Sequence, residues 1–109
     1  MTYTLLKVIK LKTGKYKYKV ILFNNSSQKE KEIFFGANGY MDYTLYYKED
    51  REKAEIHKKA YIARHSKSNE DWSVTGIETA GFWARWLLWN QPTIKKSLID
   101  IKQKFKKII

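Results

Sequence analysis

The stretch TAGFWARWLLWNQPT, residues 79–93, holds three of the four tryptophans of the chain at helical spacing. On a helix over roughly 79–90, six large apolar side chains surround the axis, and Arg85 is the one charge among them. A helix that is apolar on all sides is buried, or it offers one side to a partner. It is shorter than the ~20 residues that cross a bilayer. We therefore expect it at the centre of a small domain or in a docking surface.

The two sides of this helix favour different roles. Trp83, Leu87 and Leu88 form one packing face, and tryptophans commonly anchor the core of a small domain. The other side carries the candidate docking residues, which are Phe82, Arg85, Trp86 and Trp89. Tryptophan and arginine are enriched at protein interfaces. We favour the core interpretation and keep docking to a protein partner or a second copy as the alternative.

The first third of the chain has the pattern of strands. Segments rich in Thr, Tyr, Val and Ile predict strands over 3–12, 15–23 and 28–35. The connections at Thr13-Gly14 and at 24–27 are short, so we expect an antiparallel meander. Lysines 15, 17 and 19 alternate with apolar residues, which predicts that all three lie on one face of the second strand.

The rest of the chain predicts helices. A turn over 36–39 needs positive φ at one of its glycines, and a charged helix over 48–65 and a polar linker over 66–76 follow. The last helix begins at its N-cap, Thr93, and repeats apolar residues at Ile94, Leu98, Ile101, Phe105 and Ile108. We expect one α+β domain over 1–109, with the three-stranded meander packed against two or three helices. Structural roles are assigned to Gly36, Gly39, Tyr43, Arg64, Trp72 and Trp83.

The net charge of +11 lies at the two ends of the sequence. Residues 1–23 hold six lysines and no acid, and residues 93–109 hold six lysines with Asp100 as the one acid. Such a surface attracts phosphate backbones. The alternative is a solvated surface without a partner. The candidate nucleic-acid-binding residues are Lys10, Lys12, Lys15, Lys17, Lys19, Lys95, Lys96, Lys102 and Lys106. Base-specific contacts favour arginine, and the chain has nineteen lysines and three arginines, so we expect sequence-independent binding.

The pattern of reactive residues argues against an enzyme. The chain has no cysteine, which excludes disulfides and thiolate zinc sites. Two histidines near Asn69, Glu70 and Asp71 distantly resemble a metal-dependent nuclease, but the helix dipole already explains His65 at a helix C-terminus. We expect Asp42 to cap a turn or to pair with Arg64. No catalytic residue, cofactor or metal is therefore predicted.

Several motifs of the second half occur together: FGANGYMDYT (35–44), YIARH (61–65), EDW (70–72), GFWARWLLWNQPT (81–93) and KF (104–105). With them the chain resembles a family of small proteins from large nucleocytoplasmic DNA viruses. The matching positions are Gly39, Tyr40, Asp42, Tyr43, Thr44, Tyr61, Ile62, Ala63, Arg64, His65, 82–90, Pro92 and Thr93. The resemblance covers about residues 35–105 and implies a viral protein associated with the genome or the particle. It implies no catalytic mechanism.

Together these observations predict a small, basic, non-enzymatic viral protein that binds nucleic acid without sequence preference. The alternative is a structural module of the virion that docks, or associates with itself, through the Trp-rich helix. We expect no membrane insertion and no secretion signal, and a location in the cytoplasm or nucleus of the host cell or in the particle.

Overall fold

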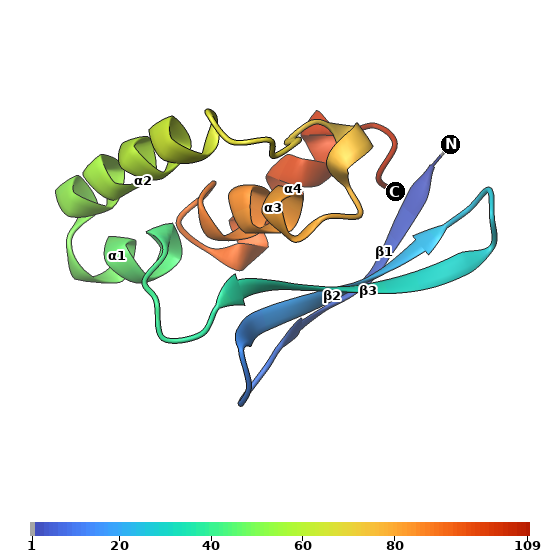
Figure 1. Cartoon of the computed structure of the whole chain (residues 1–109), viewed down its shortest axis with the longest axis horizontal. Helices are drawn as coiled ribbons and strands as arrows, with labels where there is room; N and C mark the ends of the chain where they lie inside the picture. Colours follow the sequence, from blue (N-terminus) through green and yellow to red (C-terminus); the bar gives the residue numbers. More distant parts are fainter. Residues whose placement is uncertain (1) are drawn as a thin grey trace.

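Within residues 2–109, which this computed structural model describes, three antiparallel strands carry the helices on one face of their sheet (Figure 1). The sheet has the order β1 (Tyr3–Lys10), β2 (Tyr16–Asn24) and β3 (Lys29–Ala37). The helical elements are α1 (Tyr43–Glu49), α2 (Arg51–His65), the 3-10 turn η1 (Val74–Gly76), α3 (Ala80–Trp83), the π-helical turn η2 (Ala84–Leu88) and α4 (Ile94–Lys104). The predicted α+β architecture, an N-terminal three-stranded meander followed by helices, is confirmed.

The inner face of the sheet forms one wall of the core. Residues paired across the three strands point to the same side, and the row Val8, Val20 and Ile33 faces the helices. Tyr18 and Phe35 form the next row towards the β1–β2 turn, with their rings 5.9 Å apart. The opposite wall is the Trp-rich segment, so the core lies between the sheet and α3 with η2.

The Trp-rich segment is the centre of the domain. Phe82, Trp83 and Leu87 are completely buried, and the indole Nε1 of Trp83 donates a 2.6 Å hydrogen bond to the carbonyl of Ile77. Thr79 caps the start of the segment by accepting from the amide of Phe82. The core interpretation of Trp83 is therefore confirmed.

Gly36 permits a close approach between the sheet and this segment. Its φ is +76°, and a β-carbon at this position would lie 2.6 Å from Cδ1 of the buried Leu88. Gly39 also has a positive φ, of 89°. The prediction of positive φ in this turn is confirmed at both glycines.

The charged helix differs from its prediction. Asp50 has extended backbone angles, so α1 ends at Glu49 and α2 begins at Arg51. The Asp50 carboxylate caps the new helix by accepting from the amides of Glu52 and Lys53. Residues 43–47, which the sequence places before the charged helix, therefore belong to α1 together with residues 48 and 49. The cap at Asp50 separates this helix from α2.

The last helix is shorter than its apolar repeat suggests. Thr93 is the N-cap, as predicted, but α4 ends at Lys104. The chain then turns, and Tyr3 in β1 exchanges backbone hydrogen bonds with Lys107 (2.7 Å) and Ile109 (2.8 Å). The side chain of Ile108 is 2% exposed and joins the core as part of a bridge parallel to β1. Ile108 therefore belongs to the sheet edge and not to the helix.

None of the helices within residues 2–109 combines the length and the apolar character needed to cross a membrane.

Candidate nucleic-acid interface and a neighbouring cleft

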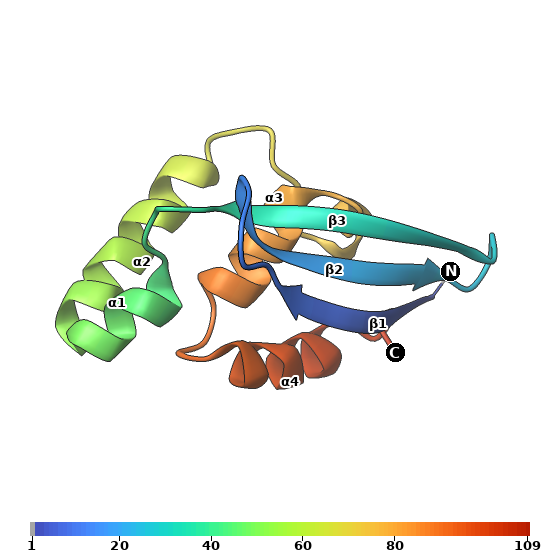
Figure 2. The same cartoon turned by 90° about the horizontal axis from the view of Figure 1, so that it is seen from below.

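The outer face of the sheet is left uncovered by the helices of residues 2–109 (Figure 1). Figure 2 views the molecule from this side, with the strands in front of α3. Strand register defines three rows on this face, which are Ile9–Lys19–Phe34, Lys7–Ile21–Glu32 and Thr4–Phe23–Glu30. An antiparallel sheet with one solvated face normally alternates apolar and polar residues, with the polar ones outside. Here the outside carries aromatic and aliphatic side chains as well as charges.

At the turn end of this face, the ring of Phe34 lies next to that of Tyr16, the first residue of β2. Tyr16 is 42% exposed and Phe34 is 40% exposed, and their ring centroids are 6.0 Å apart. The Nζ atom of Lys19 lies 5.6 Å from the centroid of the Phe34 ring and 2.9 Å from a carboxylate oxygen of Glu32. The arrangement combines two partly exposed rings with an ammonium group that is paired with Glu32, close to the β1–β2 turn.

The predicted lysines of the first hairpin do not share one face. Lys12 and Lys15 are exposed in or beside the β1–β2 turn, and Lys19 lies on the outer face. Lys10 is exposed but pairs in register with Tyr18, on the inner side at the free end of β1.

Lys17 contradicts its predicted role most clearly. Its Nζ atom lies 2.7 Å from the Asp42 carboxylate, and the two side chains are 13% and 3% exposed. Period-2 alternation places Lys17 with Lys15 and Lys19, but the structure turns it to the helix side, where a buried carboxylate neutralises its charge. Asp42 also caps α1 by accepting from the amide of Leu45, which confirms one of its two expected roles, whereas its ion-pair partner is Lys17 and not Arg64.

Helix α4 lies alongside β1, so the two basic ends of the sequence are neighbours (Figure 2). Lys7 and Lys102 line one shallow hollow of about 240 Å³ together with Leu98 and residues of β1. Lys95, Lys96 and Lys106 are exposed. Lys104 lies elsewhere, with Nζ 4.8 Å from the centroid of the Trp86 ring. Lys102 therefore extends the basic surface of the hairpin around the β1 edge.

The predicted docking residues do not form an open surface. Phe82 is 0% exposed, which corrects its assignment to an interface. Trp89 stacks on Tyr61 with ring centroids 4.4 Å apart, and the indole of Trp86 donates to the carbonyl of Trp72. Both tryptophans are thus half-buried against their own chain.

Arg85 is held between aromatic rings. Its guanidinium carbon lies 4.3 Å from the Trp86 centroid and 5.4 Å from that of Trp72. One nitrogen donates to the carbonyl of Trp89, and burial lowers the pKa of the guanidinium group. Its buried Nε has no hydrogen-bond partner within residues 2–109. The residue is an internal clamp of the Trp-rich segment, which the pattern alone did not distinguish from an interface arginine.

A cleft of about 470 Å³ opens at the end of the sheet next to the β1–β2 turn. Its lining comes from segments distant in the sequence: the ends of β2 and β3, the 36–42 connection, the end of α2, and the segment from Ala80 to Trp89. The charged and aromatic lining residues are Tyr16, Lys17, Phe35, Tyr40, Asp42, Tyr61, Arg64, His65, Glu70 and Trp89. Tyr16 lies both here and beside Phe34, so the cleft adjoins the outer face of the sheet.

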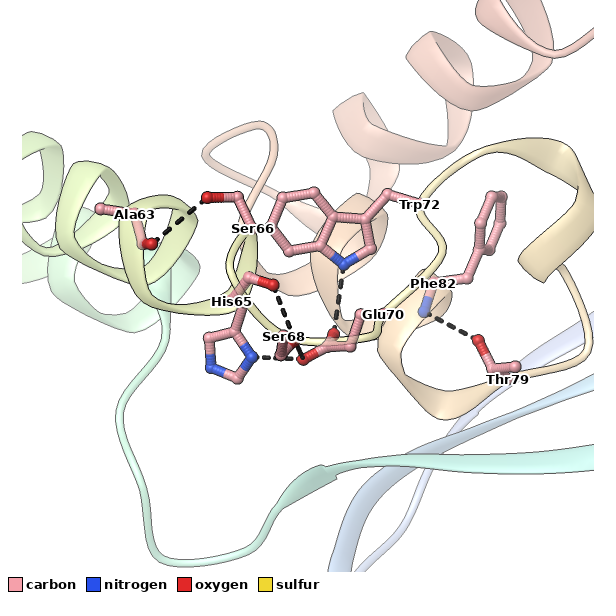
Figure 3. A network of polar contacts seen from close by, with 8 residues as sticks. All are labelled: Ala63, His65, Ser66, Ser68, Glu70, Trp72, Thr79 and Phe82. Carbon is pink, nitrogen blue, oxygen red and sulfur yellow. Dashed lines mark hydrogen bonds and ion pairs between the residues drawn. The ribbon is translucent and has the colours of Figure 1, made fainter.

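The carboxylate of Glu70, which lines the cleft, lies at the centre of the polar contacts drawn in Figure 3. Glu70 accepts from Nδ1 of His65, from the indole of Trp72 and from the hydroxyl of Ser68. Burial alone would raise the pKa of Glu70, but these hydrogen bonds and the nearby imidazole outweigh it and lower that pKa. The second ring nitrogen of His65 points away from Glu70 in Figure 3. Trp72 keeps its predicted structural role through these contacts.

Two further predicted structural residues have different outcomes. Tyr43 is buried, and its hydroxyl hydrogen-bonds to Glu55. Arg64 is exposed at the rim of the cleft, and within the described chain it has no ion pair or hydrogen bond. Its structural assignment is therefore wrong, because the predicted partner Asp42 is already occupied.

The cleft was not predicted as a site. Most of its polar residues lie in the motifs 35–44, 61–65 and 70–72, but the sequence does not show that Asp42, Arg64 and Glu70 line one cleft. Among residues 2–109, no group of three or more His, Cys, Asp or Glu side chains could hold a metal ion.

Comparison of the chain with family models, with curated proteins and with solved structures gave no match. The resemblance to a viral family therefore stays a prediction, and the function rests on the chemistry of these surfaces.

Proposed function

We propose that the protein binds single-stranded nucleic acid, without sequence preference, on the outer face of its sheet near the β1–β2 turn. The observation that carries this proposal is the exposed pair Tyr16 and Phe34, with the ammonium group of Lys19 above one ring. Sequence-tolerant binding of single strands combines aromatic rings, on which bases stack, with cations along the backbone path.

The charges near this pair favour a phosphate backbone. Lys12 and Lys15 are exposed at the turn, and Lys7 with Lys102 continues the positive surface around the edge of β1. The acidic residues of the outer face, Glu30 and Glu32, lie in rows further from the turn. A bound strand would therefore cross the turn end of the face, where the carboxylate of Glu32 is already paired with Lys19.

Two alternatives receive less support. Duplex binding needs phosphate contacts but no exposed rings. Docking through the Trp-rich helix is less supported because Phe82, one of the four candidate residues, is buried in the core. The other three pack against their own chain. The viral context, and a location in the host cell or the particle, remain part of the proposal.

Fluorescence anisotropy with labelled oligonucleotides tests it. We expect a single-stranded oligonucleotide to bind more tightly than a duplex of the same length. If about five phosphates are contacted, the slope of log K against log salt should be roughly −3.5. Phe34→Ala should weaken binding about tenfold, since stacking contributes ~1–3 kcal/mol per base. The matched control is Ile56→Ala, which removes an apolar side chain, 66% exposed, from α2.

The role of the lysines has its own charge-matched test. Lys12→Glu with Lys15→Glu should abolish most of the binding, whereas Lys53→Glu with Lys59→Glu on α2 makes the same change in net charge away from the sheet. Equal losses in the two double variants would show that only net charge matters. The absence of binding at low salt, or equal affinity of the Phe34 variant and the parent, would contradict the proposal.

A further inference from the structure

We infer that the cleft at the end of the sheet binds one nucleotide unit, with the base against its aromatic lining and the phosphate at Arg64. The unit is a free nucleotide or the residue of a bound strand that follows the bases on Tyr16 and Phe34. For a strand, the inference rests on the proposed function; for a free nucleotide, it stands on the cleft alone.

The carboxylates of the cleft have little capacity left for a ligand. Asp42 accepts from Lys17, from the hydroxyl of Thr44 and from the amide of Leu45. Glu70 is occupied by its three donors. Most acceptor positions of the two carboxylates are therefore already used within the protein, and the charge of Asp42 is also neutralised by Lys17.

The donors of the cleft, in contrast, have capacity to spare. Arg64 lines the cleft, and no other side chain among residues 2–109 pairs with its guanidinium group. The ammonium group of Lys17 has three protons, and one of them is directed at Asp42. A ligand that satisfies these groups must bring acceptors and negative charge, and arginine binds phosphate with a planar fork of donors.

The apolar part of the lining fits a planar ring. Tyr40 is 73% exposed, and no ring of the described chain stacks on it. Tyr61 and Trp89 also line the cleft, but they stack on each other and Tyr61 is 6% exposed, so the base is expected to stack on Tyr40. A volume of about 470 Å³ lies within the usual range of small-ligand sites, and such sites combine apolar walls with a few polar groups. Ring stacking and an anion together describe a nucleotide.

Tyr16 connects this site to the outer face. It lines the cleft and lies beside Phe34, so a strand stacked on these two rings would reach the cleft with its next units. This continuity gives the two surfaces one ligand chemistry. It also makes Tyr40, and not a residue of the sheet, the next stacking position.

Titration of the full chain with AMP, with adenosine and inorganic phosphate as separate probes, tests the inference. Amide chemical shifts should change at residues 40–42, 61–65 and 80–81, and AMP should bind more tightly than either probe. Arg64→Gln should weaken AMP binding about tenfold, and Tyr40→Ala should weaken it by a similar factor. The matched control is Arg51→Gln, because Arg51 is an exposed arginine at the other end of α2, beside Tyr47.

The outcomes separate the two proposals. AMP binding that is lost in the Arg64 variant supports the cleft site, even if no oligonucleotide binds and the proposed function fails. The cleft inference is overturned if AMP does not bind the parent at millimolar concentration, or if the Arg64 and Tyr40 variants bind AMP as tightly as the parent does. This holds regardless of the result with oligonucleotides. If neither variant changes oligonucleotide binding while the Phe34 variant does, strands use the outer face alone, which overturns the strand arm of the inference.

Discussion

Replacement of Asp42 tests whether the ion pair with Lys17 holds the 36–42 connection against the sheet. Asp42→Asn keeps an oxygen that can cap α1 but removes the negative charge opposite Lys17. Loss of one partner of a fully buried pair costs ~3–5 kcal/mol. Because the Lys17 side chain is 13% exposed and can reach water, we expect a smaller loss in the free energy of unfolding, of about 2 kcal/mol.

Asp42→Ala removes the cap as well, which adds about 1 kcal/mol and gives a total loss of about 3 kcal/mol. Lys17→Met leaves the carboxylate buried without its cation, and we again expect about 2 kcal/mol. The double variant Lys17→Met with Asp42→Asn leaves no unpaired charge. It should be less destabilised than the sum of the single variants, by a coupling energy of about 2 kcal/mol.

Urea unfolding followed by tryptophan fluorescence measures these values by linear extrapolation, with m-values that should stay unchanged. High salt should reduce the coupling little, since buried pairs are weakly screened. A coupling energy below about 0.5 kcal/mol, the size expected of an exposed pair, would refute the reasoning. The connection would then owe its position to its apolar contacts.

Three further variants test other contacts in the same unfolding assay. Ile108→Ala should lower the free energy of unfolding by about 2–4 kcal/mol, since its side chain is 2% exposed, whereas Ile109→Ala, at 60% exposure, should cost under about 0.5 kcal/mol; equal losses would place the tail outside the core. Gly36→Ala should cost about 1–3 kcal/mol more than Gly14→Ala, because both have positive φ but only Gly36 meets a buried side chain; a smaller difference would show that Leu88 moves aside freely. The pKa of Glu70 is lower in the folded than in the unfolded state, so its ionised form adds to the free energy of unfolding above pH 4.5, and this contribution is lost as the pH falls through the lowered pKa. The free energy of unfolding of Glu70→Gln should therefore depend less on pH in the acid range than that of the parent. Parallel pH profiles of the two proteins would contradict this.

Much of the fold follows from local patterns in the sequence. Alternation in the first 37 residues predicts the meander, and Thr93 predicts the start of the last helix, because both signals depend on near neighbours. The burial of Trp83 also follows, since a helix with apolar residues all round has few other places to go.

The errors arise where a distant residue decides. Nothing local separates Lys17 from Lys15 and Lys19; its orientation is set by a carboxylate 25 positions away. Ile108 continues the apolar repeat of α4 in the sequence, but in the structure it pairs with Tyr3 at the edge of β1. The cleft is lined by segments that are distant in the sequence. The sequence therefore shows the motifs that line it but does not predict that they lie next to one another.

The hydrogen bonds between Tyr3 and residues 107–109 also constrain how the protein is made. During translation β1 is synthesised about 100 residues before its edge partner. A contact of such sequence separation forms slowly and only after the rest has collapsed. Until then the outer backbone groups of β1 are open to other nascent chains. Pairing at the β1 edge should therefore be a late step of folding, and variants that weaken it should expose this edge to pairing with other chains.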